Sequence, residues 1–291
     1  MNIIVTPSSI NDFKLYEDAT IFVVGNSSFC EGYPYSYSCE EILLAIDEAK
    51  RLNKKIYINV NKIFQEFELE SLNSFLSLIL SKDIDGLVYT DMAVYQYVKD
   101  LGKKNLLIYA SQTQIVNKHD AKFYLDLGIK SVLISKECNL EMISNIIEYL
   151  PHKTIMFAHG YMQIFYSRRK LLENYALEYN LDINSLVEKY DIKASEFTRN
   201  KQFPLFQDQN GTIIFSDYVL CSLKYLKELL KLGLDCIWLD GLFLPLDYQL
   251  EVLKLYSHID ELNEEKIKEF INKFNNIPHG DEVLLKEDTI I

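Results

Sequence analysis

Short apolar runs recur along the chain at intervals typical of alternating strands and helices. Eight of them are nearly continuous rather than alternating, which is typical of strands covered on both faces. They are residues 3–5, 20–25, 55–60, 86–90, 105–110, 131–135, 154–159 and 236–240. Between most of them, apolar residues at i, i+3, i+4 and i+7 predict amphipathic helices, as at 40–53 and 70–82.

Glycines mark the ends of several predicted helices. The segments DLGKKNLLIY, DLGIKSVLIS and KLGLDCIWLD share one plan of helix end, glycine, short link and strand. Gly102, Gly128 and Gly233 are therefore placed to end helices in the left-handed conformation. Repeated strand–helix alternation implies a parallel sheet. Eight units favour a closed (β/α)8 TIM-barrel-like fold over an open doubly wound sheet, and no G-x-G-x-x-G follows the first strand.

The interval between the seventh and eighth apolar runs is much longer than the others. An insertion after a barrel strand lies on the face where (β/α)8 enzymes place their chemistry. We therefore predict a single domain, residues 1–291, with an insertion over 160–235 on the C-terminal face. The hydrophobic periodicity and the turn residues of the insertion predict a helical and loop subdomain. Its helices are expected at 170–180 and 184–190, and a turn at 207–212.

Composition narrows the class of protein. No apolar run reaches the ~18 residues of a membrane-spanning helix, and the N-terminus lacks a signal-peptide pattern, so we expect a cytoplasmic protein without membrane association. The net charge of −12 argues against a general nucleic-acid binder but leaves a local basic site open. Five scattered cysteines without a C-x-x-C spacing indicate reduced thiols: Cys30, Cys39, Cys138, Cys221 and Cys236.

Arginine is rare and clustered. Of four arginines, Arg168, Arg169 and Arg199 lie within one 32-residue stretch, and their planar side chains suit carboxylate or phosphate. We take them as candidate substrate-binding residues, with surface salt bridges as the alternative. If the first two lie on a helix, one should reach the barrel mouth and the other should pair with Glu173. Glu196 is a candidate catalytic acid or the partner of Arg199 in an ion pair.

Polar residues follow several predicted strands. His159 ends the seventh strand, where it could act in acid–base chemistry or be a structural histidine bonded to a carbonyl. Asp240 ends the eighth strand, and Asp91 and Gln112 follow the fourth and fifth. All three could line the barrel mouth or cap helices. We take His159 and Asp240 as candidate catalytic residues and Gln112 as a candidate substrate-binding residue.

No familiar hydrolase or metal motif is present. The sequence has no G-x-S-x-G, no H-E-x-x-H and no pair of histidines at ligand spacing, so we predict no metal site. Catalytic triads are assembled in space, so this absence does not exclude a peptidase.

One segment resembles a known family. FAHGYMQIFYSRRKLLENY, residues 157–175, resembles the signature of the U32 peptidase family, once called collagenase-like peptidases. The resemblance continues in 196–212 and in WLDG (238–241), while VTPSS, VVG and NVN (59–61) fit the family's N-terminal half. It covers nearly the whole chain. On this resemblance, Asn61 joins the candidate substrate-binding residues.

The resemblance also bears on cofactors. Longer members bind an iron–sulfur cluster through four cysteines, and Gln163 and Lys170 stand where two of those cysteines would be. Because thiolates ordinarily hold such clusters, we expect no iron–sulfur ligands and no cofactor bound by this chain. The loop FCEGYPY (29–35) lacks a basic residue that relatives carry, which puts an anion site there in doubt.

The resemblance implies a function in RNA modification. Family members act in oxygen-independent or prephenate-dependent hydroxylations, including 5-hydroxylation of the tRNA wobble uridine. Short members like this one resemble the tRNA hydroxylation proteins, with prephenate as a candidate co-substrate. A larger cysteine-bearing paralogue would then form a heteromer with this chain, and tRNA would reach a local basic site. A peptidase of unknown catalytic type and a non-catalytic partner subunit remain alternatives, so whether the chain is itself an enzyme stays open.

Overall fold

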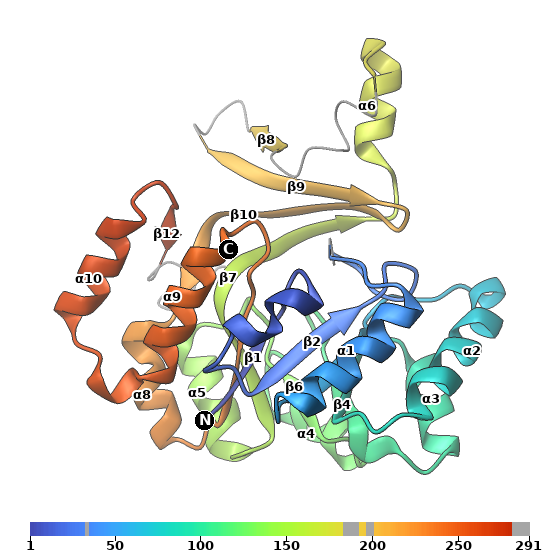
Figure 1. Ribbon diagram of the computed structural model, residues 1–291, viewed down its shortest axis with the longest axis horizontal. Coiled ribbons are helices and arrows are strands. Elements are labelled where there is room, and N and C mark those ends of the chain that lie inside the picture. The colour runs from blue at the N-terminus through green and yellow to red at the C-terminus, as the bar shows by residue number, and fades with distance from the viewer. Residues whose placement is uncertain (33–34, 183–191, 196–200, 281–291) are drawn as a thin grey trace.

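The core of the protein is a closed barrel of eight parallel strands (Figure 1). The computed structural model describes residues 1–32, 35–182, 192–195 and 201–280. The barrel strands are β1 (Asn2–Val5), β2 (Ile21–Gly25), β3 (Lys55–Val60), β4 (Gly86–Tyr89), β5 (Leu107–Tyr109), β6 (Ser131–Leu133), β7 (Thr154–Ser167) and β11 (Cys236–Leu239). Each pairs with its neighbour in chain order, and β11 closes the ring between β7 and β1. The predicted (β/α)8 barrel is confirmed.

Helices surround this barrel. They are α1 (Cys39–Arg51), α2 (Leu69–Leu80), α3 (Met92–Asp100), α4 (Lys118–Asp126), α5 (Leu140–Tyr149), α8 (Leu223–Lys231), α9 (Leu246–Ser257) and α10 (Glu264–Lys273). Short 3₁₀ helices are η1 (Ile10–Leu15), η2 (Glu66–Glu68), η3 (Lys104–Leu106) and η4 (Ile259–Glu261). Local sequence fixes several ends: Ser38 and Glu41 form a capping box at the start of α1, and Asp91 caps α3 through the Ala93 N–H. In the part of the chain that the structure describes, no helix is long and apolar enough to span a membrane.

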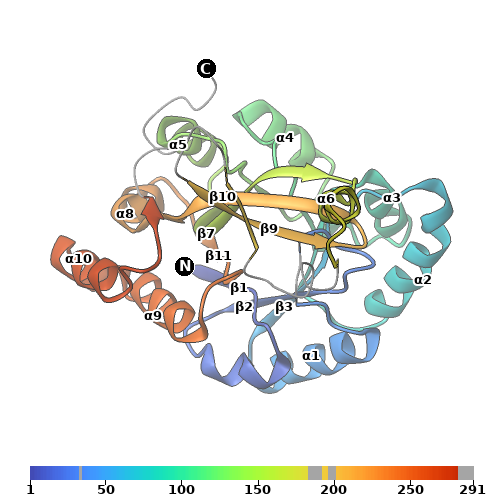
Figure 2. The same cartoon turned by 90° about the horizontal axis from the view of Figure 1, so that it is seen from above.

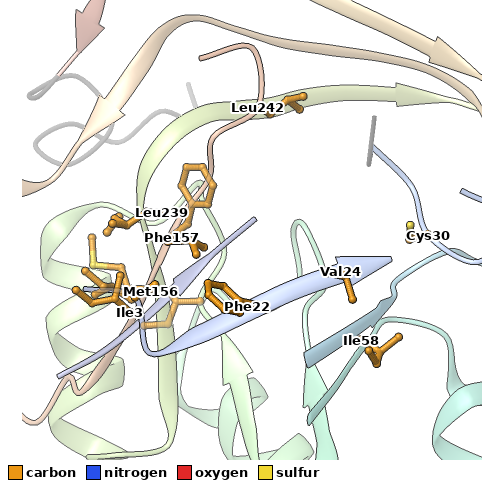
Figure 3. Close-up of a cluster of buried hydrophobic side chains, with 14 of the residues drawn as sticks. Ile3, Phe22, Val24, Cys30, Ile58, Met156, Phe157, Leu239 and Leu242 are labelled. Carbon is orange, nitrogen blue, oxygen red and sulfur yellow. The ribbon is translucent and has the colours of Figure 1, made fainter. Parts of the chain in front are cut away.

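Alternate strand residues face two separate cores, which explains the continuous apolar runs. Side chains such as Ile4, Ile21 and Tyr57 fill the inside of the barrel. Their neighbours Ile3 and Phe22 point outward, into a larger core between the barrel and its helices (Figure 3). The strands are therefore apolar on both faces, and polar side chains are left for the ends of the barrel.

The insertion differs from the expected helical and loop subdomain. β7 continues past the barrel and pairs antiparallel with β10 (Gly211–Cys221), which pairs with β9 (Gln202–Asp208), which in turn pairs with β8 (Lys193–Ser195). We call residues 160–167 together with these three strands the roof sheet, because it crosses above the barrel (Figures 1 and 2). The expected helix at 170–180 is α6 (Leu171–Tyr179), whereas 184–190 lie outside the described residues. The short strand β12 (His279–Gly280) also pairs with β10.

Candidate functional site

A cavity lies where the barrel strands end, beneath the roof sheet. The space between its walls, with the open solvent at its mouth counted in, is about 670 Å³. Thr6, Asn59 and Gln112 line it from the barrel side, and Gln163 and Phe215 line it from the roof sheet. Its position, at the C-terminal ends of the strands, is typical of small-molecule sites.

Three predicted site residues, Asn61, Gln112 and Asp240, line this cavity. Asp240 follows β11, and its Oδ1 accepts hydrogen bonds from the Thr6 hydroxyl at 3.0 Å and the Leu242 N–H at 3.1 Å. Burial raises the pKa of Asp240 above its ordinary value, opposed by the Lys136 charge and by these hydrogen bonds. A carboxyl group with a raised pKa in a cavity wall is suited to exchanging a proton with a ligand.

Lys136, a cavity residue that sequence reasoning missed, follows β6. Its ammonium lies over the Phe157 ring, 4.2 Å from the ring centroid, a cation–π contact. Burial lowers the pKa of Lys136, and the Asp240 charge opposes this effect. Among the described residues, no carboxylate oxygen lies within 4.0 Å of the ammonium. The cavity therefore contains a partly buried cation with no direct ion-pair partner in the described part of the chain.

Three residues that line the cavity also have a buried polar atom without a hydrogen-bond partner. Within the described ranges, five buried side-chain atoms have no hydrogen-bond partner, and three belong to cavity residues: Asn59 Oδ1, Gln112 Oε1 and Trp238 Nε1. Asn59 is 5% exposed and Trp238 is 9% exposed. A buried polar group without a partner costs about 1–3 kcal/mol, so such groups are rare. These three atoms have almost no accessible surface, so they lie behind the surface of the wall and do not face the cavity.

The roof sheet is fastened to the loops after β2 and β3. The side-chain amide of Asn210, in the β9–β10 turn, donates to the Ser27 carbonyl at 2.6 Å and the Cys30 carbonyl at 3.2 Å. Arg168 donates to the Ile63 carbonyl at 2.6 Å. Glu31 accepts from the Ile63 N–H at 3.2 Å. Burial raises the pKa of this cavity-lining carboxyl group, opposed by its hydrogen bonds and by Arg168. These polar contacts close one side of the cavity.

We expect Asn210→Ala to loosen this side of the cavity. The variant removes both hydrogen bonds to the β2–α1 loop but no core packing, so the global stability should fall by only about 1 kcal/mol. Amide hydrogen exchange in 26–31 and 205–214 should become at least fivefold faster. Gln202→Ala, at an exposed position of β9 away from this loop, is the control. If amide hydrogen exchange in these segments is equally fast in the two variants, the Asn210 hydrogen bonds do not hold the roof sheet to the β2–α1 loop.

The two adjacent arginines do not lie on a helix. Arg168 and Arg169 occupy the turn between β7 and α6. Both side chains are exposed, and Arg168 donates to the Ile63 carbonyl in the loop after β3. Glu173, the expected partner of one arginine, pairs instead with Lys170 at 3.0 Å. The expectation of an Arg–Glu173 pair was wrong because β7 extends to Ser167 and places the arginines in a turn.

Comparisons with known proteins agree with this architecture. The family model described as peptidase family U32 matches residues 23–281. The chain belongs to the U32 peptidase family. It is 27% identical to the tRNA hydroxylation protein P2 of Bacillus subtilis over 273 residues, which cover 92% of this chain and 88% of that protein.

Two further relatives are longer. The tRNA hydroxylation protein P of Escherichia coli is 25% identical, over 70% of this chain and 55% of that protein. An archaeal relative from Methanocaldococcus jannaschii, named uncharacterized protease MJ0090, is 25% identical, over 76% of this chain and 54% of that protein. This U32 chain thus spans most of the first relative and about half of the other two.

His159 lies on the other side of β7 from the cavity. Its Nε2 is 2.8 Å from the Tyr248 hydroxyl, which is 2.7 Å from Nε2 of His279. The Tyr256 hydroxyl lies 3.4 Å from Nδ1 and donates to the Ala158 carbonyl at 2.8 Å. Burial, with a smaller effect of His279, lowers the pKa of His159 from 6.5 to about 3. This geometry keeps the ring neutral and fixed between β7 and α9.

The remaining candidate residues lie in different places, as do Gln163 and Lys170, which stand where longer family members carry cluster cysteines. Glu196 and Arg199 lie outside the described residues. Gln163 lines the cavity, and Lys170 lies in the turn before α6. Among the described residues, no group of three or more histidine, cysteine or acidic side chains could hold a metal ion. The absence of a bound cofactor stays a prediction.

Proposed function

We propose that this U32 protein takes part in the prephenate-dependent 5-hydroxylation of the tRNA wobble uridine, together with a larger paralogue. The observation that carries this proposal is the match to a tRNA hydroxylation protein along nearly the full length of both chains. The cavity supports it, because a roofed barrel mouth with one lysine and several amides suits a small polar co-substrate. The paralogue would supply any redox cofactor, and the exposed Arg169 would contact tRNA phosphate.

A peptidase receives no support from the cavity. In the described part of the chain, its lining includes no serine, cysteine or histidine, the side chains of the common nucleophile–base pairs. The described lining of the cavity therefore gives no support to the activity that the family's name suggests. The cavity-filling variants described below distinguish a catalytic role from that of a non-catalytic partner.

The proposal predicts a specific change in tRNA. Deleting the gene should remove 5-hydroxylated uridine from the wobble position, measured by mass spectrometry of tRNA nucleosides. Because relatives of this kind occur as paralogues, the deletion is made with and without the larger paralogue. Unchanged hydroxylation in every deletion strain would contradict the proposed function.

Cavity-filling variants then test where the reaction takes place. Gln163→Trp would place a larger ring from the roof sheet into the cavity and should reduce hydroxylation at least tenfold. The neighbouring Ile164 is 55% exposed and does not line the cavity, so Ile164→Trp should keep the wild-type level. If both variants restore hydroxylation while the deletion abolishes it, the chain serves as a partner subunit.

A further inference from the structure

Lys136 is the only lysine among the described residues that line the cavity. Its ammonium lies over the Phe157 ring, with no carboxylate oxygen of the described chain within 4.0 Å. Leu133, Phe215 and Leu242 line the same cavity and make much of its wall apolar. Apolar surroundings disfavour the charged form of an amine, and the neutral amine is the nucleophilic form. The cavity therefore contains a nitrogen nucleophile that is not ion-paired to a described acid.

Lys130, at the opposite end of β6, shows what sets Lys136 apart. Burial lowers the pKa of both lysines, and both ammonium groups lie over an aromatic ring. The Lys130 ammonium, however, donates to the Asp85 carbonyl at 2.5 Å, and Lys130 does not line the cavity. Lys136 instead follows the C-terminal end of β6 and borders the cavity. Its position, more than its pKa, makes Lys136 reachable by a small molecule.

We infer that Lys136 is a nucleophilic residue that forms an imine with a small aldehyde or ketone in the cavity. This activity goes beyond the proposed function and does not rest on it. The substrate class is defined by an electrophilic carbonyl carbon, and the substrate needs no acid group. Lysine is the side chain that forms such bonds with carbonyl substrates.

Imine formation moves two protons from the nitrogen to the carbonyl oxygen. The ammonium first loses one proton to the Asp240 carboxylate, and the neutral amine then adds to the carbonyl carbon to form the C–N bond. A second nitrogen proton passes to the oxygen, which gives a carbinolamine. Asp240 returns its proton to this hydroxyl group, the C–O bond breaks, and water leaves as the C=N bond forms. The product is a protonated imine, so the nitrogen keeps its positive charge.

Asp240 is placed for this proton exchange. Its carboxyl group borders the same cavity as Lys136, and the two charges influence each other without a direct ion pair. A carbonyl group can therefore approach the amine without first breaking an ion pair. Burial raises the pKa of Asp240, which makes its carboxylate a better proton acceptor. The Phe157 ring would stabilise the protonated imine as it does the ammonium.

The test is reductive trapping of the imine on the purified full chain. The protein is incubated at pH 7 with butanal, a neutral aldehyde, and with sodium cyanoborohydride, whose hydride reduces the imine to a stable secondary amine. Peptide mass spectrometry then locates the butyl groups. Lys136 should be labelled about tenfold faster than Lys130 and than Lys268 of α10, which is exposed. The three lysines are compared within one sample, so the rate of the reagent cancels.

Variants of the cavity show where the aldehyde reacts. Gln163→Trp, which fills the cavity, should slow the labelling of Lys136 at least tenfold, whereas the matched Ile164→Trp should leave it unchanged. Asp240→Asn, which keeps the shape of the side chain but cannot take up the proton, should slow it about fivefold. Labelling of Lys268 should be the same in all three variants, and circular dichroism checks that they fold.

Other results would overturn the assignment. Equal rates at Lys136 and Lys268 would show an amine of ordinary reactivity, and an unlabelled Lys136 would show an ammonium that stays charged. Unchanged labelling in Gln163→Trp would mean that the aldehyde does not react inside the cavity. Unchanged labelling in Asp240→Asn would exclude Asp240 from the proton transfer. The experiment uses no tRNA, so its failure is distinguishable from a failure of the nucleoside measurements in deletion strains.

Discussion

Replacing Gly160 by alanine is expected to lower the free energy of unfolding by about 3 kcal/mol or more. Gly160 lies where β7 leaves the barrel, and its φ of 134° is a conformation that residues with a Cβ rarely adopt. An added Cβ would lie 2.8 Å from the Asp240 carbonyl oxygen and 3.0 Å from Cζ of Phe157. The substitution therefore combines backbone strain with collisions against the wall of the cavity.

Gly102→Ala is the matched control for backbone strain alone. Gly102 has a φ of 70°, but an added Cβ there would meet nothing within 4 Å. It should cost about 1–2 kcal/mol, the penalty of the left-handed conformation. Urea denaturation of both variants measures the difference. Equal losses of stability would show that the contact between Gly160 and Asp240 is not tight.

Much of the cavity was predictable from strand alternation. Inward positions of a strand recur every two residues, so Asn61 and Gln112 follow the inward Tyr57 and Ile108 at even spacing. Asp240 follows Cys236 and Trp238 in the same way. Such residues continue the inner face of the barrel beyond its apolar core. The sequence pattern placed Gln112 and Asp240 at strand ends, whereas Asn61 came from the family resemblance.

The same rule fails at His159 because of a local irregularity. Ile155 points into the barrel, so even spacing would also direct His159 inward. Between β7 and β11, however, the register shifts: Trp238 pairs with Phe157, and the next residue, Leu239, pairs with His159. This extra residue turns His159 toward α9. No feature of a single sequence identifies such a bulge in advance.

Lys136 and the roof sheet were missed for a different reason. Lys136 lies at odd spacing from the inward Leu133, and the loop after β6 turns it into the cavity, which alternation does not predict. The roof strands are held by pairing between segments far apart in the chain, such as Phe165 with Ile214. Their apolar runs are short, and their strand conformation depends on a partner that the local pattern does not show.

Lowering the pH should destabilise the protein through His159 in particular. Its pKa in the folded state, about 3, is below the ordinary value of 6.5, so the unfolded chain binds a proton first. The stability from the neutral ring is fully present above pH 6.5 and is lost as the pH falls toward 3, by about 1.4 kcal/mol per pH unit. Between pH 7 and pH 5 this residue alone should cost about 2 kcal/mol.

Comparison of His159→Gln with wild type isolates this effect from the titration of carboxyl groups. The variant removes the titrating ring, so urea denaturation should show it less stable than wild type at pH 7, with a difference that shrinks by about 2 kcal/mol at pH 5. His152→Gln is the control, because the His152 side chain is 68% exposed beside Asp235, so this variant removes a histidine without disturbing the core. A pH-independent difference between His159→Gln and wild type would mean that His159 accepts a proton in the folded protein. The residue would then regain the acid–base capacity that its burial between β7 and α9 removes.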